Sequence, residues 1–293
     1  MSKSKNSRVV VVYLDDDSYQ FHMFKMFLKS IKLINAKDTD IVIFYEPRYE
    51  SLFSSYGNTS IGNNQAGLIF KKMVPPVFQN TGFQDYKYVN SIACLIGQNW
   101  LLDYKYILRT DVDTVLTPRW NSIYPDCFTT GSGLYNNDIN TKVRLQKVME
   151  RLKLPQRKDY SYNIGSTWYG PSSEVIDTAT LSSKIVKDLL FNDFKSFVGK
   201  WPGFFRDVCS LYSGEIAVNY LIKNFKIDSN NFDFDSTSSD SVFHHAHIHC
   251  WHTVKLFSKH AFFDGKYKNT DVKKLDRNVI NQYCLFCALT GEI

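Results

Sequence analysis

The segment "YKYILRTDVDTVLTP" (104–118) decides both the fold and the chemistry expected of this chain. It begins with the apolar residues of a buried strand, 106–108, and then places Asp111 and Asp113 one residue apart before Pro118 closes it. Because alternate side chains on an extended backbone point to the same side, both carboxylates can face one spot. Two carboxylates that lie so close together repel each other unless a cation or a proton lies between them. The segment therefore predicts a strand that ends in a cation-binding acid pair.

Strands and helices alternate in the part of the chain that precedes this segment. The runs "VVVVYL" (9–14) and "DIVIFYE" (40–46) are typical of strands that are covered on both faces. Apolar residues at helical spacing predict helices over 21–34 and 87–102, and a stretch rich in Gly, Asn and Ser predicts a loop over 54–67. This alternation predicts an α/β fold with a mostly parallel central sheet flanked by helices.

The second half of the chain has a looser pattern. Helices are expected over 142–154, 172–191 and 214–225, and a strand is expected over 162–171. The sequence contains no internal repeat and no linker-like stretch, so we expect a single domain over residues 1–293.

Composition limits the class of protein. Hydrophobic residues make up 44% of the 293 residues, and the net charge of +6 suits an anionic small molecule without implying nucleic-acid binding. No apolar run approaches the roughly 20 residues of a membrane span. The basic start "MSKSKNSRVVVVYLDDD" lacks the long apolar core and small-residue cleavage site of a signal peptide. With six scattered cysteines read as reduced thiols, the sequence predicts a cytoplasmic protein.

Acidic residues follow two of the expected strands. Asp15 to Asp17 follow the first strand, and Asp111 and Asp113 end the strand of the opening segment. Ligands of open α/β sheets bind outside the carboxyl ends of the strands. Carboxylate oxygens at that edge are suitable ligands for Mg²⁺ or Mn²⁺, which keep open positions for phosphate oxygens.

A second concentration of possible ligands is "FHHAHIHCWHTVKLFSKHAF" (243–262), which holds six of the seven histidines. On an extended strand His245, His247 and His249 would point to one side, where imidazole could bind a Mn²⁺-type or zinc ion. The alternative is a solvated polar edge strand. "CLFC" (284–287) could add a zinc ligand pair, or its two cysteines could face one apolar side of a helix.

Three of these segments resemble motifs of glycosyltransferases with the GT-A fold. "ILRTDVDTVLTP" (107–118) resembles their D-x-D segment, and "YNIGSTWYGP" (162–171) is similar to the Asn-x-Gly strand that often follows it. "HCWHTVK" (249–255) resembles the late His-x-x-Gly-x-x-Lys element of the glycogenin-like retaining branch, with His252 where that branch has glycine. A side chain there would crowd a close backbone approach.

The resemblance implies a GT-A fold with two functional halves. Residues of about 8–120 would form the nucleotide-sugar-binding half. Residues of about 121–293 would form the acceptor half, ending in a segment that binds metal and diphosphate.

The resemblance also implies roles for individual residues. Asp113 and His249 would bind the metal ion, and Asp111 would bind the metal or the ribose. Glu215 or Asp207 would act at the donor sugar or the acceptor hydroxyl, although a glutamate at a helix N-terminus is also favoured by the helix dipole. The residues implied in donor binding are Tyr13, Leu14, Asp15, Arg109, Asp111, Asn163, Gly165 and Lys255.

The activity that this implies is transfer of a hexose from a UDP-sugar to a glycan or protein-linked acceptor, with Mn²⁺ or Mg²⁺ as cofactor. Retention of configuration is implied by His249 and Lys255, whereas an inverting enzyme would use a carboxylate such as Glu215 as general base. One alternative is a metal-dependent phosphohydrolase or nucleotidyltransferase, although the sequence has no Gly-rich phosphate cradle. Another is a non-catalytic zinc-binding module built on the histidines and cysteines.

Overall fold

The computed structural model describes residues 6–55, 59–64, 66–73, 86–250 and 256–292. Lys255, to which the resemblance gave the donor diphosphate, and His252 lie outside the described residues.

The chain forms two compact units that interleave along the sequence. The first unit comprises residues 1–72, 110–124 and 228–293, and the second comprises residues 73–109 and 125–227. The two aspartates of the D-x-D pair, Asp111 and Asp113, therefore belong to the first unit, together with the histidine-rich segment.

The first unit is built on a parallel sheet with an antiparallel edge. Its strands are β1 (Arg8–Leu14), β2 (Thr39–Tyr45), β3 (Thr59–Ile61) and β4 (Ala66–Lys72), in the order β3-β4-β2-β1. The pairs β1–β2 and β2–β4 are parallel, and β3 pairs antiparallel with β4. Every residue of β1 and β2 is buried, as their continuous apolar runs predict. The loop predicted over 54–67 is wrong in part, because β3 and the start of β4 lie within it.

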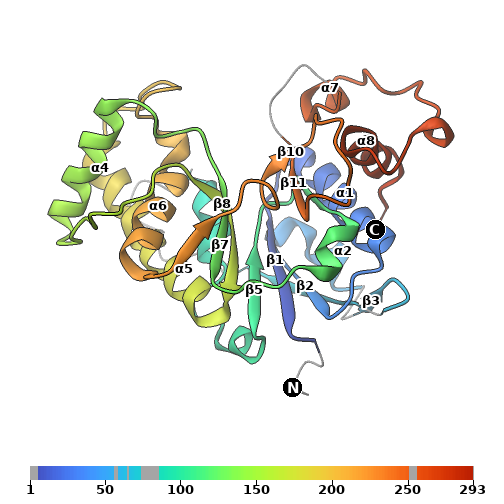
Figure 1. The fold of residues 1–293 in the computed structure, drawn as a ribbon, viewed down its shortest axis with the longest axis horizontal. Helices are drawn as coiled ribbons and strands as arrows, with labels where there is room; N and C mark the ends of the chain where they lie inside the picture. Colours follow the sequence, from blue (N-terminus) through green and yellow to red (C-terminus); the bar gives the residue numbers. More distant parts are fainter. Residues whose placement is uncertain (1–5, 56–58, 65, 74–85, 251–255, 293) are drawn as a thin grey trace. The chain divides into compact units, whose positions relative to one another are not determined.

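Among the described residues the first unit has four α-helices. They are α1 (Ser18–Ile34), α2 (Glu50–Phe53), α7 (Lys259–Phe263) and α8 (Ile280–Thr290). The longest of them, α1, packs against β1. Helix α1 begins where the Asp17 side chain accepts a hydrogen bond of 2.8 Å from the backbone N–H of Tyr19. In Figure 1, α8 lies beside α1, and the two helices are in contact. The prediction of an α/β fold with flanking helices is confirmed.

A small second sheet in the first unit adjoins the D-x-D pair. It contains β6 (Thr114–Leu116), β10 (Phe234–Asp235) and β11 (His247–His249), in the order β10-β11-β6. The strand expected across the opening segment is broken: β5 (Tyr106–Arg109) ends before the aspartates and β6 begins after them. The two carboxylates therefore lie on a bend rather than on an extended strand.

The second unit has a mixed sheet. Its strands are β5, β7 (Phe128–Ser132), β8 (Ile164–Pro171) and β9 (Phe225–Ile227), in the order β5-β8-β7-β9. Strand β8 is antiparallel to both of its neighbours, and β7 and β9 are parallel. The mostly parallel pairing that we predicted holds for the first unit, whereas both pairs made by β8 are antiparallel.

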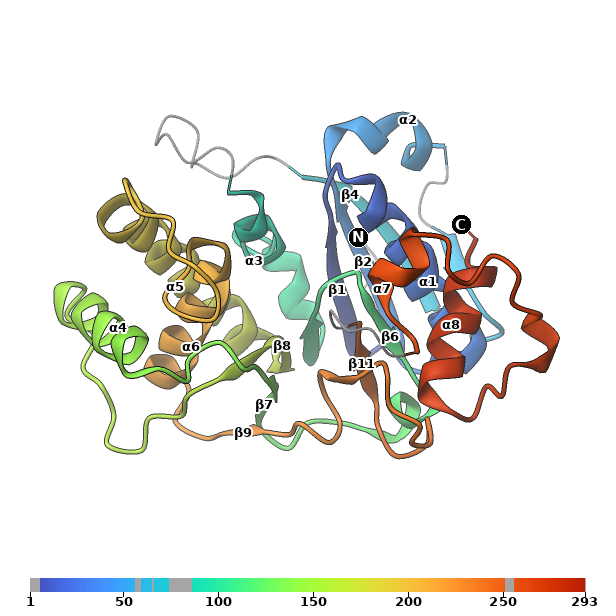
Figure 2. The same ribbon diagram turned by 90° about the horizontal axis from the view of Figure 1, so that it is seen from above.

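The helices of the second unit are α3 (Asn90–Ala93), α4 (Ile139–Arg151), α5 (Ser172–Asp188) and α6 (Cys209–Leu221). Helices α5 and α6 pack against each other, as Figure 2 shows. The single helix predicted over 87–102 is wrong, because Gly97 has a φ of +74° and only short 3₁₀ and α turns form around it.

Helix α6 begins five residues before the predicted start at Gly214. A Cβ atom on Gly214 would lie 2.8 Å from the Trp168 ring of β8, so this glycine allows close packing within the helix rather than marking its beginning. Glu215 consequently lies in the middle of the helix. Among the described residues, the helices are too short or too polar to cross a bilayer.

The buried side chain of Arg8 connects separate segments of the first unit by hydrogen bonds. Its side chain is fully buried, and its guanidinium donates hydrogen bonds to the backbone carbonyls of Lys37 (2.6 Å), Trp120 (2.9 Å) and Ile123 (2.9 Å). The same group lies 4.5 Å from the Trp120 ring centroid. One side chain therefore joins β1 to two segments that are distant in sequence.

We expect Arg8→Met to lower the free energy of unfolding by about 3 kcal/mol, because the substitution leaves buried carbonyl groups without a donor. Urea denaturation measures the change. Arg119→Met, at an exposed position, is the matched control and should change stability by less than about 0.5 kcal/mol. Equal stability of the two variants would contradict the role given to Arg8.

Candidate metal centre and a buried carboxylate

Three predicted ligands meet in the first unit. One ligand atom each from Asp111, Asp113 and His249 lie within 4.8 Å of one another. The antiparallel pairing of β6 with β11 sets Thr114 opposite His249, and the backbone N–H of Cys250 donates to the Asp113 carbonyl at 2.9 Å. His249 Nε2 lies 3.4 Å from Asp113 Oδ1. The backbone ladder therefore holds the imidazole beside the acid pair.

Two further residues complete this centre, and the sequence did not indicate either of them. Lys259 Nζ, at the start of α7, donates to Asp113 Oδ2 at 2.6 Å. Asp233 Oδ1 lies 3.4 Å from His249 Nδ1, on the far side of the ring from Asp113. Neither residue belongs to a motif that can be read from one sequence, because tertiary packing alone brings them to the site.

Charge pairing determines the protonation of the centre. Burial by itself would raise the pKa of Asp113, but the Lys259 ammonium and His249 together lower that pKa well below its ordinary value. Burial would lower the pKa of His249, yet the Asp113 carboxylate raises it well above its ordinary value. The protein thus holds the ionised carboxylate of Asp113 between cationic groups. A divalent ion at the same place would also neutralise its charge.

The donor set fits the predicted metal ions. Two carboxylates and one imidazole are ligands that Mn²⁺ accepts, and Mg²⁺ accepts the carboxylate oxygens. Lys259 competes with such an ion for the same oxygen of Asp113. The chemistry of the site is therefore compatible with a divalent cation that displaces an ammonium group.

The other two histidines expected on the same side of a strand do not reach the acid pair. His247 is fully buried; its Nδ1 accepts from the Asp233 N–H at 3.2 Å, and its Nε2 lies 2.8 Å from the Thr110 hydroxyl. Burial lowers the pKa of His247 to about 4, so this ring is neutral and structural. His245 pairs with Asp240. The predicted one-sided row holds for His247 and His249, whose Nδ1 atoms lie 3.8 and 3.4 Å from the same oxygen of Asp233, and is wrong for His245, which precedes β11.

The residues expected to receive the base and ribose lie at the end of β1. Tyr13 is 7% exposed, and its hydroxyl donates to the Glu46 carboxylate. Leu14 is fully buried, and Asp15 accepts a hydrogen bond of 2.9 Å from the backbone N–H of Asp17. Tyr13 and Leu14 are therefore core residues of the strand, and their roles in nucleotide binding stay predictions.

Arg109 is part of the second unit. Its guanidinium donates to the carbonyl of Ser91 at 3.0 Å and to the carbonyl of Ser166, and it lies 5.4 Å from the Trp168 ring centroid. The side chain is 3% exposed. These contacts show that Arg109 supports the sheet, and its predicted role in donor binding stays untested.

Glu215 is the centre of a buried network in the second unit. Its Oε1 accepts from Asn136 Nδ2 at 2.6 Å and from the Tyr160 hydroxyl at 3.2 Å. Its Oε2 accepts from the backbone N–H of Asn163 at 2.6 Å. Asn163 has a φ of +60°, and its own Oδ1 accepts from the Asn136 N–H at 2.7 Å. Glu215 therefore fixes the turn that leads into β8, in which Gly165 is buried.

Burial raises the pKa of Glu215 to about 7, even though hydrogen bonds from Asn163, Asn136, Tyr135 and Tyr160 act in the opposite direction. The side chain is 0% exposed. The second predicted acid, Asp207, is half-exposed in a 3₁₀ turn, where its carboxylate lies 3.5 Å from Arg206 Nε. Glu215 and Asn163 are thus brought together, whereas Asp207 pairs with its neighbour.

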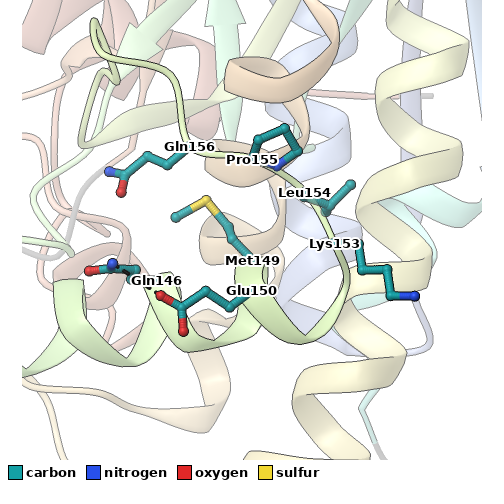
Figure 3. Close-up of a pocket in the computed structure, with 7 residues that line it drawn as sticks. All are labelled: Gln146, Met149, Glu150, Lys153, Leu154, Pro155 and Gln156. Atoms are coloured by element: carbon teal, nitrogen blue, oxygen red, sulfur yellow. Dashed lines mark hydrogen bonds between the residues drawn. The ribbon is translucent and has the colours of Figure 1, made fainter.

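A surface pocket in the second unit lies at the end of α4, as Figure 3 shows. Gln146 Nε2 donates to Glu150 Oε1 at 3.1 Å along one edge of it. The pocket is lined by Gln146, Met149, Glu150, Lys153, Leu154, Pro155 and Gln156. None of these residues was predicted to act in catalysis or binding, so the pocket does not bear on the predicted site.

Comparison with known families shows the family to which the chain belongs. The chain belongs to the family described as a domain of unknown function, DUF7164, whose model matches residues 2–290. The match spans both units, including the D-x-D pair, the histidine-rich segment and Glu215. No curated protein matches the chain.

The raised pKa of Glu215 predicts a particular pH dependence of stability. A carboxyl group whose pKa is about 7 when folded and 4.5 ordinarily binds more protons when folded, so its contribution is complete below pH 4.5 and is lost as the pH rises through 7. Glu215→Gln removes that loss. The stability of the variant relative to the natural chain should therefore improve by about 3 kcal/mol between pH 4.5 and 7.5.

Urea denaturation at several pH values measures this difference. Glu150→Gln, an exposed substitution on α4, is the control and should leave the pH dependence unchanged. A constant difference between the natural chain and Glu215→Gln across this range would show that Glu215 is not the titrating group.

Proposed function

We propose that the chain is a metal-dependent glycosyltransferase that moves a hexose from a UDP-sugar to a glycan or protein-linked acceptor, with retention of configuration. The observation that carries the proposal is the convergence of Asp111, Asp113 and His249, whose ligand atoms lie within 4.8 Å of one another. These are the three residues to which the resemblance to GT-A glycosyltransferases gave the metal. Their meeting supports that resemblance because His249 lies more than a hundred residues from the two aspartates in sequence.

Asp111, Asp113 and His249 would hold Mn²⁺ or Mg²⁺. When bound, the ion supplies positive charge that stabilises the departing nucleoside diphosphate. Asp233 contributes by orienting His249: its carboxylate lies 3.4 Å from Nδ1 and keeps a proton there, so that Nε2 faces Asp113. An outer carboxylate of this kind fixes the tautomer that a metal-binding histidine needs.

Lys259 gives the centre a second source of positive charge. Its ammonium binds Asp113 Oδ2 at 2.6 Å and its side chain is 16% exposed. With Asp113 engaged by a divalent ion, the Lys259 ammonium would be able to bind a phosphate oxygen of the donor as a point charge. We assign to Lys259 the contact with the diphosphate that the resemblance gave to Lys255.

Glu215 is assigned a positioning role. Both carboxylate oxygens already accept hydrogen bonds, from Asn136, Tyr160 and the Asn163 N–H, and no part of the side chain reaches the surface. A general base must reach the acceptor hydroxyl. In this proposal Glu215 instead holds Asn163 in its left-handed conformation at the start of β8.

Nucleotide release tests the proposal directly. With a panel of UDP- and GDP-sugars, Mn²⁺ and glycan acceptors, the natural chain should release UDP, and EDTA should stop the release. Asp113→Asn should lower turnover by about 100-fold or more, because charge stabilisation at the leaving group is lost. Asp126→Asn, at an exposed position, is the matched control.

The products distinguish the alternatives. A glycosyltransferase breaks the bond between the anomeric carbon and the diphosphate and releases UDP, and NMR of the product shows whether configuration is retained. Release of UMP and sugar 1-phosphate would instead indicate a phosphohydrolase. Full turnover by Asp113→Asn would refute the site assignment.

Competition between Lys259 and the metal ion gives a separate prediction. Lys259→Met should bind Mn²⁺ about tenfold more tightly, a change of about 1.4 kcal/mol, because the ammonium no longer occupies Asp113. Its turnover should fall because the diphosphate loses a positive charge. Calorimetry without donor and steady-state assays measure the two effects, with exposed Lys266→Met as control. Unchanged Mn²⁺ affinity would mean that the ammonium and the ion do not share the site.

A further inference from the structure

A second group of possible metal ligands lies in the first unit, outside the centre described above. One ligand atom each from Asp240, His244 and His245 lie within 4.8 Å of one another. His245 Nε2 is 3.0 Å from Asp240 Oδ2, and His244 Nδ1 is 3.1 Å from Asp240 Oδ1. Two imidazole rings thus approach the two oxygens of one carboxylate.

The hydrogen bond on the other side of the His245 ring determines its protonation. His245 Nδ1 lies 2.5 Å from the carbonyl oxygen of Asn230, which can only accept, so Nδ1 carries a proton. In a neutral ring Nε2 then has a lone pair that points at Asp240 Oδ2, only 3.0 Å away. Two such lone pairs repel each other. A cation must therefore lie between His245 and Asp240, either a proton on Nε2 or a metal ion.

Contacts within the protein hold His245 and Asp240 in place without an ion. The His245 side chain is 2% exposed, and the Phe234 ring stacks on it with centroids 3.5 Å apart and an interplanar angle of 17°. Asp240 Oδ1 accepts a hydrogen bond of 2.7 Å from the Ser241 N–H, which orients the carboxylate. The Asn230 carbonyl is the kind of outer partner that metal-binding histidines have. Two of the three ligands therefore have fixed orientations.

We propose that Asp240, His244 and His245 bind a zinc ion, independently of the proposed transferase activity. Two imidazoles and a carboxylate form a donor set typical of zinc. The two imidazoles approach different oxygens of Asp240, at 3.0 and 3.1 Å, and one ligand atom of each of the three residues lies within 4.8 Å of the other two, so a single ion placed among them is within reach of all three side chains. His244 and Asp240 are 65% and 46% exposed, so water can take the fourth position. The ion would restrain residues 240–245, and with them the contact between His245 and the Asn230 carbonyl.

Zinc calorimetry on the metal-stripped chain tests the proposal, with Co²⁺ absorption as a report of tetrahedral geometry. His244→Ala should weaken zinc binding at this site at least about tenfold, since even outer partners of metal ligands contribute about 10–100-fold. The side chain of His244 is exposed, so its removal should leave the fold intact. His260→Ala, another exposed histidine of the same segment, is the matched control.

The same titrations on Asp113→Asn separate the two centres, because that substitution removes the Asp111–Asp113–His249 centre and leaves this one. Zinc binding that persists there and is lost on adding His244→Ala supports the proposal. Bound zinc should also raise the melting temperature of the natural chain more than that of His244→Ala.

Equal zinc affinity of the natural chain and His244→Ala would overturn the proposal. So would ¹⁵N NMR spectra that show both nitrogens of His245 protonated in the presence of excess zinc. Either result would mean that a proton, rather than a metal ion, lies between His245 and Asp240.

Discussion

The candidate centre depends on one short antiparallel ladder, the pairing of β6 with β11. It sets Thr114 opposite His249 and so brings a late imidazole beside the D-x-D pair. The hydrogen bond from the Cys250 N–H to the Asp113 carbonyl continues the pairing past the end of β6. Main-chain bonds therefore fix the distance between acid and imidazole, and side-chain packing only has to orient the rings.

This ladder creates an electrostatic problem that the surrounding residues solve. Asp113 is 7% exposed, and a buried carboxylate without a partner is costly. The protein supplies Lys259 and His249 as cationic partners of Asp113. The Asp233 carboxylate compensates the charge of His249 at its other ring nitrogen, Nδ1. The same arrangement that keeps Asp113 ionised also makes it a ligand for a stronger cation. Stability without a metal ion and affinity for one are thus two consequences of one charge distribution.

The sequence predicted those parts of the structure that leave a repeating pattern. Continuous apolar runs revealed β1 and β2 because burial on both faces excludes polar residues. No repeating pattern in the sequence marks the bend at the D-x-D pair, and Lys259 meets Asp113 only through tertiary packing. Neither the bend nor this contact could therefore be predicted. Gly214 suggested a helix start. It lies instead inside α6, at a position where the Trp168 ring leaves no room for a larger side chain.

The histidine-rich segment shows why composition reveals an affinity for cations but not the number of sites. A longer strand would have kept alternate histidines on one face. Because β11 spans only His247–His249, the chain before it turns, and His245 meets Asp240 while His249 meets Asp113. His247, between them, is buried and neutral. His247 and His249 share Asp233 as a neighbour, so what distinguishes them is that His247 is fully buried whereas His249 also faces Asp113.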